Sequence, residues 1–575
     1  MNSLRHEPNR DKPVSTPQLP GHLAIGVYGG KGSIQDLCLT HKTRFIHRAA
    51  LIWALLAFAA VIVSYVRRLH MSLDGDYHGW GSACFLTIAR AFNELGALHS
   101  RFVPIPNNLP VGSDPDVYLH WPPLFSLVLA LFLKAFGDAP AAGRVLELII
   151  VILTAAIVMM ITHRLFSPTV ALLFGFFYLT SRATYQGASA IEPQALAMLF
   201  ASASVLFFLF AVEPEENAAP RSPSTSRGPT QLPYALIGVI CVILTVLTAW
   251  DPIFIPFGLL ACSVYLRCRA GIRLAFSYIS AAVVTFVAIQ TDYLLSYPAL
   301  FKNQFATIAY RAGLNFNGDS SAHLHTFIDQ TDYGTQLSLF SAFTKIWQNI
   351  FSFLGPFALV ASCIVFAIWF KNMRLRERHP DRSIVLLLFG FGLPWIAWYV
   401  VMRNYVAIHS YVLVMATPFV AIASAIVLDA IWNFLSASPR EKPVLWLMAT
   451  IFPALLISPL IVNIAFAHQS FEPPKFSDLS PLIEHNTPPN AVVLSPIQSL
   501  VPTYYSRRHI VRGIQSDLSL QLSIVEAHAG FQGSPLFLAM LDSDKKCFPA
   551  TLPHLKVVAE QGDAVVYELA DRNAP

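Results

Sequence analysis

Ionisable side chains recur in the polar segments that separate the long apolar runs of this 575-residue chain. Such groups are costly at membrane depth, so they are rare there unless they are paired or take part in function. A carboxylate can accept the proton of an attacking hydroxyl or amine, and a cation can stabilise a departing phosphate. The set therefore favours group transfer from a lipid carrier at a membrane surface. Its members are Asp74, Asp76, His78, His120, Glu192, Asp251, Arg403 and His409.

Taken singly, each of these residues also has an ordinary structural explanation. Aspartate is a common helix cap, and charged side chains are usually exposed at the protein surface. Together these residues are stronger evidence for a functional site than any one of them is alone. Within it, Asp76 is the first candidate for the base and Asp74 the second, while Arg403 or one of the histidines is the candidate for holding phosphate.

The elements that must position these residues are membrane helices. The chain is 55% apolar and only 13% charged, which is far from the balance of a water-soluble protein. Its net charge of +5 is not gathered on one face, which argues against a nucleic-acid partner. A spanning helix needs about 20 apolar residues. Eleven runs meet or approach this length: 49–66, 144–164, 167–184, 189–212, 233–250, 252–268, 274–296, 347–370, 383–402, 410–433 and 443–467.

A twelfth apolar run, 122–137, is short and begins with two prolines. Loops rich in lysine and arginine stay in the cytoplasm. If this run does not cross, the basic clusters that follow it, including the one at 371–382, all lie inside. We therefore predict eleven spans and one interfacial helix, with the N-terminus cytoplasmic and the candidate residues gathered on the outer side. Residues 67–121 then form the first outer loop.

The remaining segments divide the chain into regions. Residues 1–43 form a polar, disordered tail, and 213–232 form a Pro/Ser-rich cytoplasmic linker within the membrane region 44–468. From 470 to 575 short alternating strands predict a small extracytoplasmic α/β domain. The expected strands are 491–494, 509–511, 536–539, 555–558 and 565–569, with a helix over 516–528. We interpret Arg507 and Arg508 in this domain as a solvated edge, with contact to glycan as the alternative.

The motifs around these residues resemble the polyprenyl-phosphate-sugar glycosyltransferases of the GT-C fold, which include protein O-mannosyltransferases and aminoarabinose transferases. The strongest match is the segment Tyr118-Leu119-His120-Trp121-Pro122-Pro123-Leu124, which resembles the "HPP" segment of the family and leads through an interfacial helix to Arg144. The resemblance covers about residues 45–435. Further matching segments are 74–96, 190–193, 250–252 and 409–411, the last followed by Pro418.

The resemblance implies a fold and an activity. It implies an all-α polytopic, GT-C-like protein with the small α/β domain added, and an inverting transfer of a sugar from an undecaprenyl- or dolichyl-phosphate carrier. The family places its catalytic carboxylate in the first outer loop, which implies Asp76 or Asp74 here, with Glu192 shaping the site. Arg144 either holds phosphate or anchors a helix. A divalent metal is possible, and the acceptor is a glycan, a lipid or a protein.

Two other classes remain open from the sequence. A secondary transporter also has many spans, although its charged residues are expected near the membrane midplane rather than at one surface. A non-catalytic scaffold or sensor would tolerate replacement of both Asp74 and Asp76. We expect the protein in a bacterial inner membrane, because the loops are simple and eukaryotic sorting signals are absent.

Overall fold

The computed structural model describes the chain in two compact units, Met1–Trp53 and Ala54–Pro575. The described residues are 59, 62–75, 78–107, 118–212, 231–298, 301, 308–309, 311–314, 338–374, 381–436, 476, 478–497, 499–512, 534–547 and 555–569. The predicted tail, the apolar run 443–467, the helix over 516–528 and Asp76 lie outside them.

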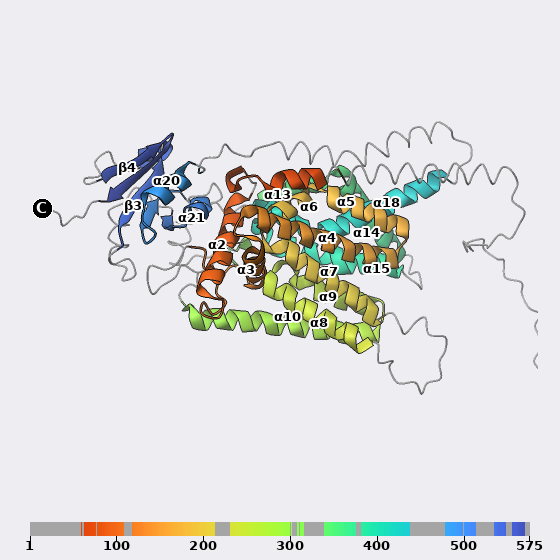
Figure 1. Cartoon of the computed structure of the whole chain (residues 1–575). Helices are drawn as coiled ribbons and strands as arrows, with labels where there is room; N and C mark the ends of the chain where they lie inside the picture. Colours follow the sequence, from red (N-terminus) through yellow and green to blue (C-terminus); the bar gives the residue numbers. More distant parts are fainter. Residues whose placement is uncertain are drawn as a thin grey trace, which may run out of the picture. The chain divides into compact units, whose positions relative to one another are not determined.

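The membrane region is built from apolar helices, with α7 packed on both α4 and α8 (Figure 1). A helical stretch over 62–69 leads into the first outer loop. The elements that follow are η1 (Leu73–Gly75), α2 (Gly79–Leu95), α3 (Leu124–Phe136), α4 (Pro140–Leu165), α5 (Pro168–Thr180), α6 (Arg182–Ser189), α7 (Pro193–Val212), α8 (Gln231–Thr248), η3 (Asp251–Phe254), α9 (Ile255–Tyr265), α10 (Arg269–Ser296), α13 (Leu339–Leu354), α14 (Pro356–Arg374), α15 (Arg382–Leu387), η4 (Leu388–Gly392), α16 (Leu393–Val401), α17 (Arg403–Ile408), η5 (Ser410–Met415) and α18 (Thr417–Ser436).

Four of the described helices are long and apolar enough to cross a membrane by themselves. They are α4, α7, α10 and the continuous helix Arg382–Val401, and they correspond to the predicted spans 144–164, 189–212, 274–296 and 383–402. Shorter apolar helices occupy the predicted runs 167–184, 233–250, 252–268 and 410–433. With 13 residues, α3 is about 20 Å long, too short for a hydrocarbon core of about 30 Å. This length fits the predicted interfacial helix over 122–137.

The predicted single span 347–370 is wrong, because this region is two helices bent by 108°. Gly355 ends α13 with a φ of +84°, a conformation that favours glycine, and Pro356 starts α14. One face of α13 carries the exposed side chains of Phe340, Trp347 and Phe351. An aromatic face of this kind is typical of a helix lying in the membrane surface. By length and composition the bent pair is either a broken span or a re-entrant loop.

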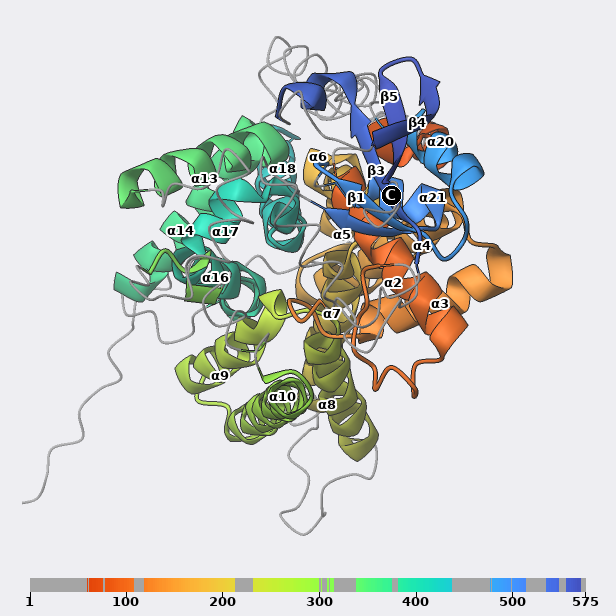
Figure 2. The same ribbon diagram turned by 90° about the vertical axis from the view of Figure 1, so that its left-hand side faces the viewer.

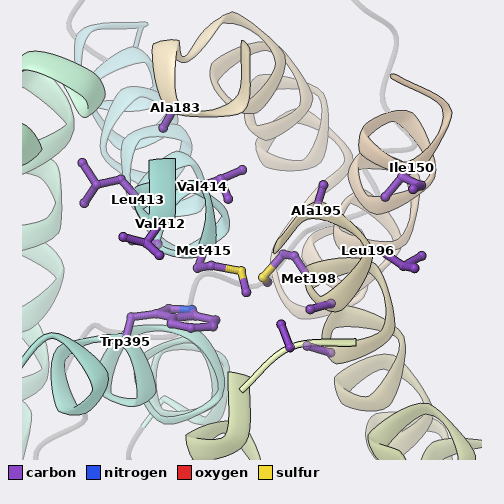
Figure 3. Close-up of a cluster of buried hydrophobic side chains, with 14 of the residues drawn as sticks. Ile150, Ala183, Ala195, Leu196, Met198, Trp395, Val412, Leu413, Val414 and Met415 are labelled. Atoms are coloured by element: carbon purple, nitrogen blue, oxygen red, sulfur yellow. The ribbon is translucent and has the colours of Figure 1, made fainter. Parts of the chain in front are cut away.

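A second break separates α5 from α7, where the sequence pattern predicts two consecutive spans. The Ser181 hydroxyl accepts the Thr184 N–H at 3.1 Å and caps the short helix α6. The segment η5 packs on α6 and α7. Figure 3 shows Met415 of η5 facing Met198 of α7, with Trp395 of α16 beside them. This buried cluster fixes the end of the segment that follows His409.

The C-terminal region contains a five-stranded mixed sheet in the order β2-β1-β3-β5-β4 (Figure 2). β1 is parallel to β2 and β3, whereas β5 is antiparallel to β3 and β4. All five predicted strands are present, and α20 packs on β4 and β5. The elements are α20 (Leu479–Asn486), β1 (Val492–Ser495), α21 (Val501–Ser506), β2 (His509–Arg512), β3 (Leu536–Leu541), η7 (Asp542–Cys547), β4 (Leu555–Gln561) and β5 (Ala564–Leu569).

Candidate active site

His120 lies in the short segment that precedes α3, and three hydrogen bonds fix this segment. The Tyr118 N–H donates to the Pro104 carbonyl at 2.8 Å. The Trp250 indole donates to the His120 carbonyl at 2.9 Å, and the Tyr293 hydroxyl donates to the Trp121 carbonyl at 3.2 Å. Residues from three other parts of the chain thus hold one histidine at the edge of the membrane helices.

Glu192 precedes the first turn of α7, where its backbone and side chain are both engaged. The Glu192 N–H donates to the Glu147 carboxylate at 3.0 Å, and the neighbouring Ile191 N–H donates to the Ser82 hydroxyl at 3.0 Å. The Glu192 carboxylate forms an ion pair with His78 Nδ1. A Cβ added to Gly81 would overlap both partners of this pair, so α2 needs glycine at this position.

His409 lies between α17 and η5 and belongs to the same group of side chains. Its ring centroid is 6.1 Å from that of His78 and 4.9 Å from that of Tyr405. The Tyr405 hydroxyl in turn accepts a hydrogen bond from Gln194 at 3.5 Å, and its ring centroid lies 6.2 Å from that of Trp121. The predicted residues His78, Glu192 and His409 are therefore neighbours, although the sequence separates them by more than 300 residues.

Arg311 is a site residue that the sequence analysis missed. Its guanidinium lies 4.9 Å from the Tyr405 ring centroid. It is also close enough to His120, His409 and Asp251 for its charge to act on all three. Arg311 follows the long helix α10 on the predicted outer side, where the positive-inside rule disfavours basic residues. That departure from the rule is the signal in the sequence that would have identified it.

Arg403 holds the segment that carries Arg311. Its guanidinium donates to the Gly313 carbonyl at 2.6 Å. Gly313 has a φ of +71°, and a Cβ there would come within 2.6 Å of the Arg403 guanidinium. Both the backbone conformation and the close approach therefore require glycine. The geometry makes Arg403 a support for Arg311 rather than the first cation of the site.

Asp251, the first residue of η3, is fully buried in the same region. Gln194, Arg311 and Glu192 are close enough to interact with it. Neither of its carboxylate oxygens accepts a hydrogen bond of normal geometry from the described residues. A buried carboxylate without full hydrogen bonding is costly, which makes Asp251 a candidate to bind a polar group of a substrate.

Two half-buried histidines of the site, His120 and His409, have lowered pKa values, which favours their uncharged form near neutral pH. Burial, with a contribution from the Arg311 charge, lowers the pKa of His120 from 6.5 to about 3. Burial, followed by the effects of His78 and Arg311, lowers the pKa of His409 well below its usual value. These rings can donate or accept hydrogen bonds but do not add positive charge. Arg311 is then the principal cation of the group.

Arg144 has a structural role in this conformation. Its side chain is only 1% exposed, and its guanidinium donates to the carbonyls of Arg68 at 3.1 Å and Leu69 at 3.3 Å, as well as to those of Met71 and Ser72. Arg68 and Leu69 end the helical stretch 62–69, and Met71 and Ser72 directly follow it, so the guanidinium binds the carbonyls at the C-terminal end of this helix. The arrangement favours the anchoring role over the phosphate-binding role.

Of the two candidate bases, Asp74 lies within the described residues. The Asp74 carboxylate lies near the backbone of Phe476, and burial raises its pKa from 3.8 to about 6. The charged groups of the His78–Glu192 pair are not among those that act on it. Asp76 lies outside the described residues, two positions before His78 in the sequence.

A metal site is not formed by the residues that the structure describes. Among them, no three histidine, cysteine or acidic side chains lie close enough together to hold a metal ion. Three further aspartates of the first outer loop, Asp76, Asp114 and Asp116, fall outside this part of the chain. The divalent metal remains a prediction.

Polar groups thus lie beside the ends of α7, η3 and α17, and a mixed sheet follows the helices in the chain. Residues 120–219 match the family model described as dolichyl-phosphate-mannose-protein mannosyltransferase. This segment contains His120, Glu147 and Glu192. Among curated proteins, none matches the chain significantly in sequence.

Two solved structures share the fold over nearly the whole chain. ArnT from Cupriavidus metallidurans bound to undecaprenyl phosphate has a TM-score of 0.57 and 16% identity, over 91% of this chain and 99% of that protein. The same protein in the apo state has a TM-score of 0.56 and 14% identity, over 91% and 98%. The fold expected from the sequence, a GT-C-like membrane protein with a small C-terminal α/β domain, is thereby confirmed, and the chain is an integral membrane protein.

Proposed function

We propose that this protein transfers a sugar from a polyprenyl-phosphate carrier to an acceptor at the extracytoplasmic membrane surface. The observation that carries the proposal is the gathering of Arg311, His120, Asp251, His409 and the His78–Glu192 pair at one end of the helices. The fold that holds them is shared with an enzyme solved with undecaprenyl phosphate bound. The predicted orientation, with the N-terminus cytoplasmic and these groups outside, is part of the proposal.

The proposed reaction is a single displacement at the anomeric carbon of the sugar. The acceptor oxygen or nitrogen forms a bond to this carbon while the bond from the carbon to the phosphate oxygen breaks, which inverts the configuration. The acceptor proton passes to the carboxylate of Asp76, or alternatively Asp74. The bonding electron pair leaves with the polyprenyl phosphate, whose added negative charge Arg311 stabilises.

Asp76 is preferred as the base for two reasons. It lies two residues before His78, whose ring contacts Glu192 inside the group. Asp74 is instead near the backbone of Phe476, outside the group. Glu192 and Asp251 are proposed to bind hydroxyl or amine groups of the sugar or the acceptor, with the neutral rings of His120 and His409 as hydrogen-bonding partners.

The test is turnover by purified protein in lipid with radiolabelled polyprenyl-phosphate hexose or pentose donors. We expect release of the sugar from at least one donor, with transfer to a glycan, lipid or protein acceptor. NMR of the product is expected to show the anomer opposite to that of the donor. Binding of small solutes to the protein without any donor turnover would contradict the proposal and favour a secondary transporter. Absence of both would favour the scaffold or sensor.

A further inference from the structure

One segment of the C-terminal region, residues 504–510, contacts the first outer loop at three separate places. The first contact precedes the candidate bases. The Leu73 N–H donates to the Tyr505 hydroxyl at 3.1 Å, and Leu73 is fully buried. The bonded amide therefore lies directly before Asp74 and three residues before Asp76.

The second contact is on α2, which follows the candidate bases. The Arg90 guanidinium donates to the Tyr504 carbonyl at 2.9 Å and to Asp138 at 2.7 Å, and it lies over the Tyr504 ring at 4.4 Å from the centroid. The same Asp138 carboxylate accepts hydrogen bonds from the Tyr504 hydroxyl at 3.3 Å and from Arg507 at 3.3 Å. A carboxylate with two arginines and a tyrosine forms a charge-assisted network, the stronger class of hydrogen bond.

The third contact lies further along the loop, at Asn107. Its side-chain amide donates to the Ile510 carbonyl at 3.2 Å, and its side-chain oxygen accepts the Ile510 N–H at 3.3 Å. Asn107 is only 4% exposed, so both hydrogen bonds are shielded from water. This reciprocal pair of hydrogen bonds resembles the bonding between two opposite residues of neighbouring β-strands.

The segment itself is held rigidly by Arg508, contrary to the interpretation of Arg507 and Arg508 as a solvated edge. Arg508 is 8% exposed, and its guanidinium donates to the Glu484 carbonyl at 2.7 Å and the Thr487 carbonyl at 2.8 Å. Arg507 is exposed but bonds to Asp138. The pair links α20 of the C-terminal domain to Asp138, the carboxylate that also accepts a hydrogen bond from Arg90 of the first outer loop.

From these contacts we propose that residues 504–510 form a clamp that positions the first outer loop, so that Tyr505, Tyr504 and Asn107 act as positioning residues for the carboxylate base. The loop is fixed directly before the segment that carries Asp74 and Asp76 and at two places after it. In this account the C-terminal domain is a support of the active site, and its two tyrosines face the protein's own loop instead of glycan. The catalytic part of this inference rests on the proposed function.

The first test is Tyr505→Phe, which removes one hydroxyl and keeps the ring. Hydrogen–deuterium exchange of the full-length protein in lipid nanodiscs reports the Leu73 amide. Loss of one neutral hydrogen bond is expected to speed its exchange about two- to tenfold. Tyr567→Phe, on β5 of the same sheet, is the matched control and is expected to leave exchange in the first outer loop unchanged. Unchanged exchange at Leu73 in Tyr505→Phe would overturn the clamp.

The second test measures donor turnover of the same two variants. A positioning role predicts that Tyr505→Phe lowers kcat while the donor KM and the midpoint of thermal unfolding stay within the range of Tyr567→Phe. Faster exchange with an unchanged kcat would overturn the role in positioning the base. Because exchange needs no activity, faster exchange in Tyr505→Phe beside an inactive wild type would support the clamp while refuting the proposed function.

Discussion

Replacing Arg311 by glutamine tests which cation acts on the departing phosphate. The guanidinium lies over Tyr405 and acts electrostatically on His120, His409 and Asp251. The pKa values of the two histidines are lowered, which favours their neutral forms. A charge-assisted hydrogen bond contributes about 1.5–3 kcal/mol. At about 1.4 kcal/mol per tenfold, its loss lowers kcat/KM by about 10- to 150-fold. Because charge on the phosphate grows as its bond to the sugar breaks, part of the loss is expected in kcat.

Steady-state turnover over a range of donor concentrations measures this effect. Arg311→Lys keeps the charge but loses the planar fork that suits phosphate, so it is expected to recover part of the activity. The matched control is Arg164→Gln, which removes an arginine in the last turn of α4. Its guanidinium lies 4.6 Å from the Phe210 ring centroid. A kcat/KM for Arg311→Gln within twofold of that for Arg164→Gln would refute the assignment.

Three further predictions concern the residues around this cation. Arg403→Gln and Gly313→Ala are each expected to lower kcat/KM about tenfold, because either change disturbs the Arg403–Gly313 contact beside Arg311. A tenfold loss corresponds to about 1.4 kcal/mol. Wild-type kinetics for both variants would contradict this prediction. Glu192→Gln removes the charge paired with His78 and is expected to lower kcat/KM at least tenfold, by about the strength of one charge-assisted hydrogen bond; a smaller loss would exclude a direct role. Burial raises the pKa of Asp74 to about 6, so the folded protein binds this proton more tightly than the unfolded chain does. The protonated Asp74 therefore stabilises the folded state below about pH 4, and this stabilisation is lost as the pH rises through about 6. The midpoint of thermal unfolding is expected to fall between pH 4.5 and about pH 8 in wild type, and to fall less in Asp74→Asn. The same dependence of the midpoint on pH in both proteins would contradict this prediction.

The sequence predicted the architecture well where local patterns determine it. The strands of the C-terminal sheet coincide with short apolar runs between polar segments, and all five were located, although β1 and β3 are buried almost throughout instead of alternating. The positions of the basic residues predicted that 122–137 does not cross the membrane, and the 13-residue length of α3 agrees with this prediction. The same method failed at 347–370, because apolar windows measure length and hydrophobicity but not direction. Gly355-Pro356, a frequent helix end followed by a helix start, was the local signal for the bend.

The candidate site was predicted in part, and its omissions have a common physical cause. His78 and His120 lie in the predicted first outer loop, and Glu192, Asp251 and His409 lie at or beside the predicted outer ends of spans, so their position at one surface followed from the topology. Arg311 lies beyond the end of α10, and only tertiary packing brings it beside Tyr405. In the same way, nothing in the first outer loop itself shows that Arg90 bonds to residues more than 400 positions away. Contacts of this kind depend on the three-dimensional arrangement of the helices.

The most direct test of the central claim compares wild type, Asp76→Asn and Asp74→Asn in donor turnover by purified protein in lipid. A general base contributes about 10²- to 10⁴-fold to the rate. If Asp76 is the base, Asp76→Asn is expected to lose at least 100-fold while the protein remains folded, and Asp74→Asn is expected to keep at least about a tenth of wild-type turnover. Turnover that is indifferent to both substitutions, or that is lost only in Asp74→Asn, would contradict the assignment of Asp76 as the base.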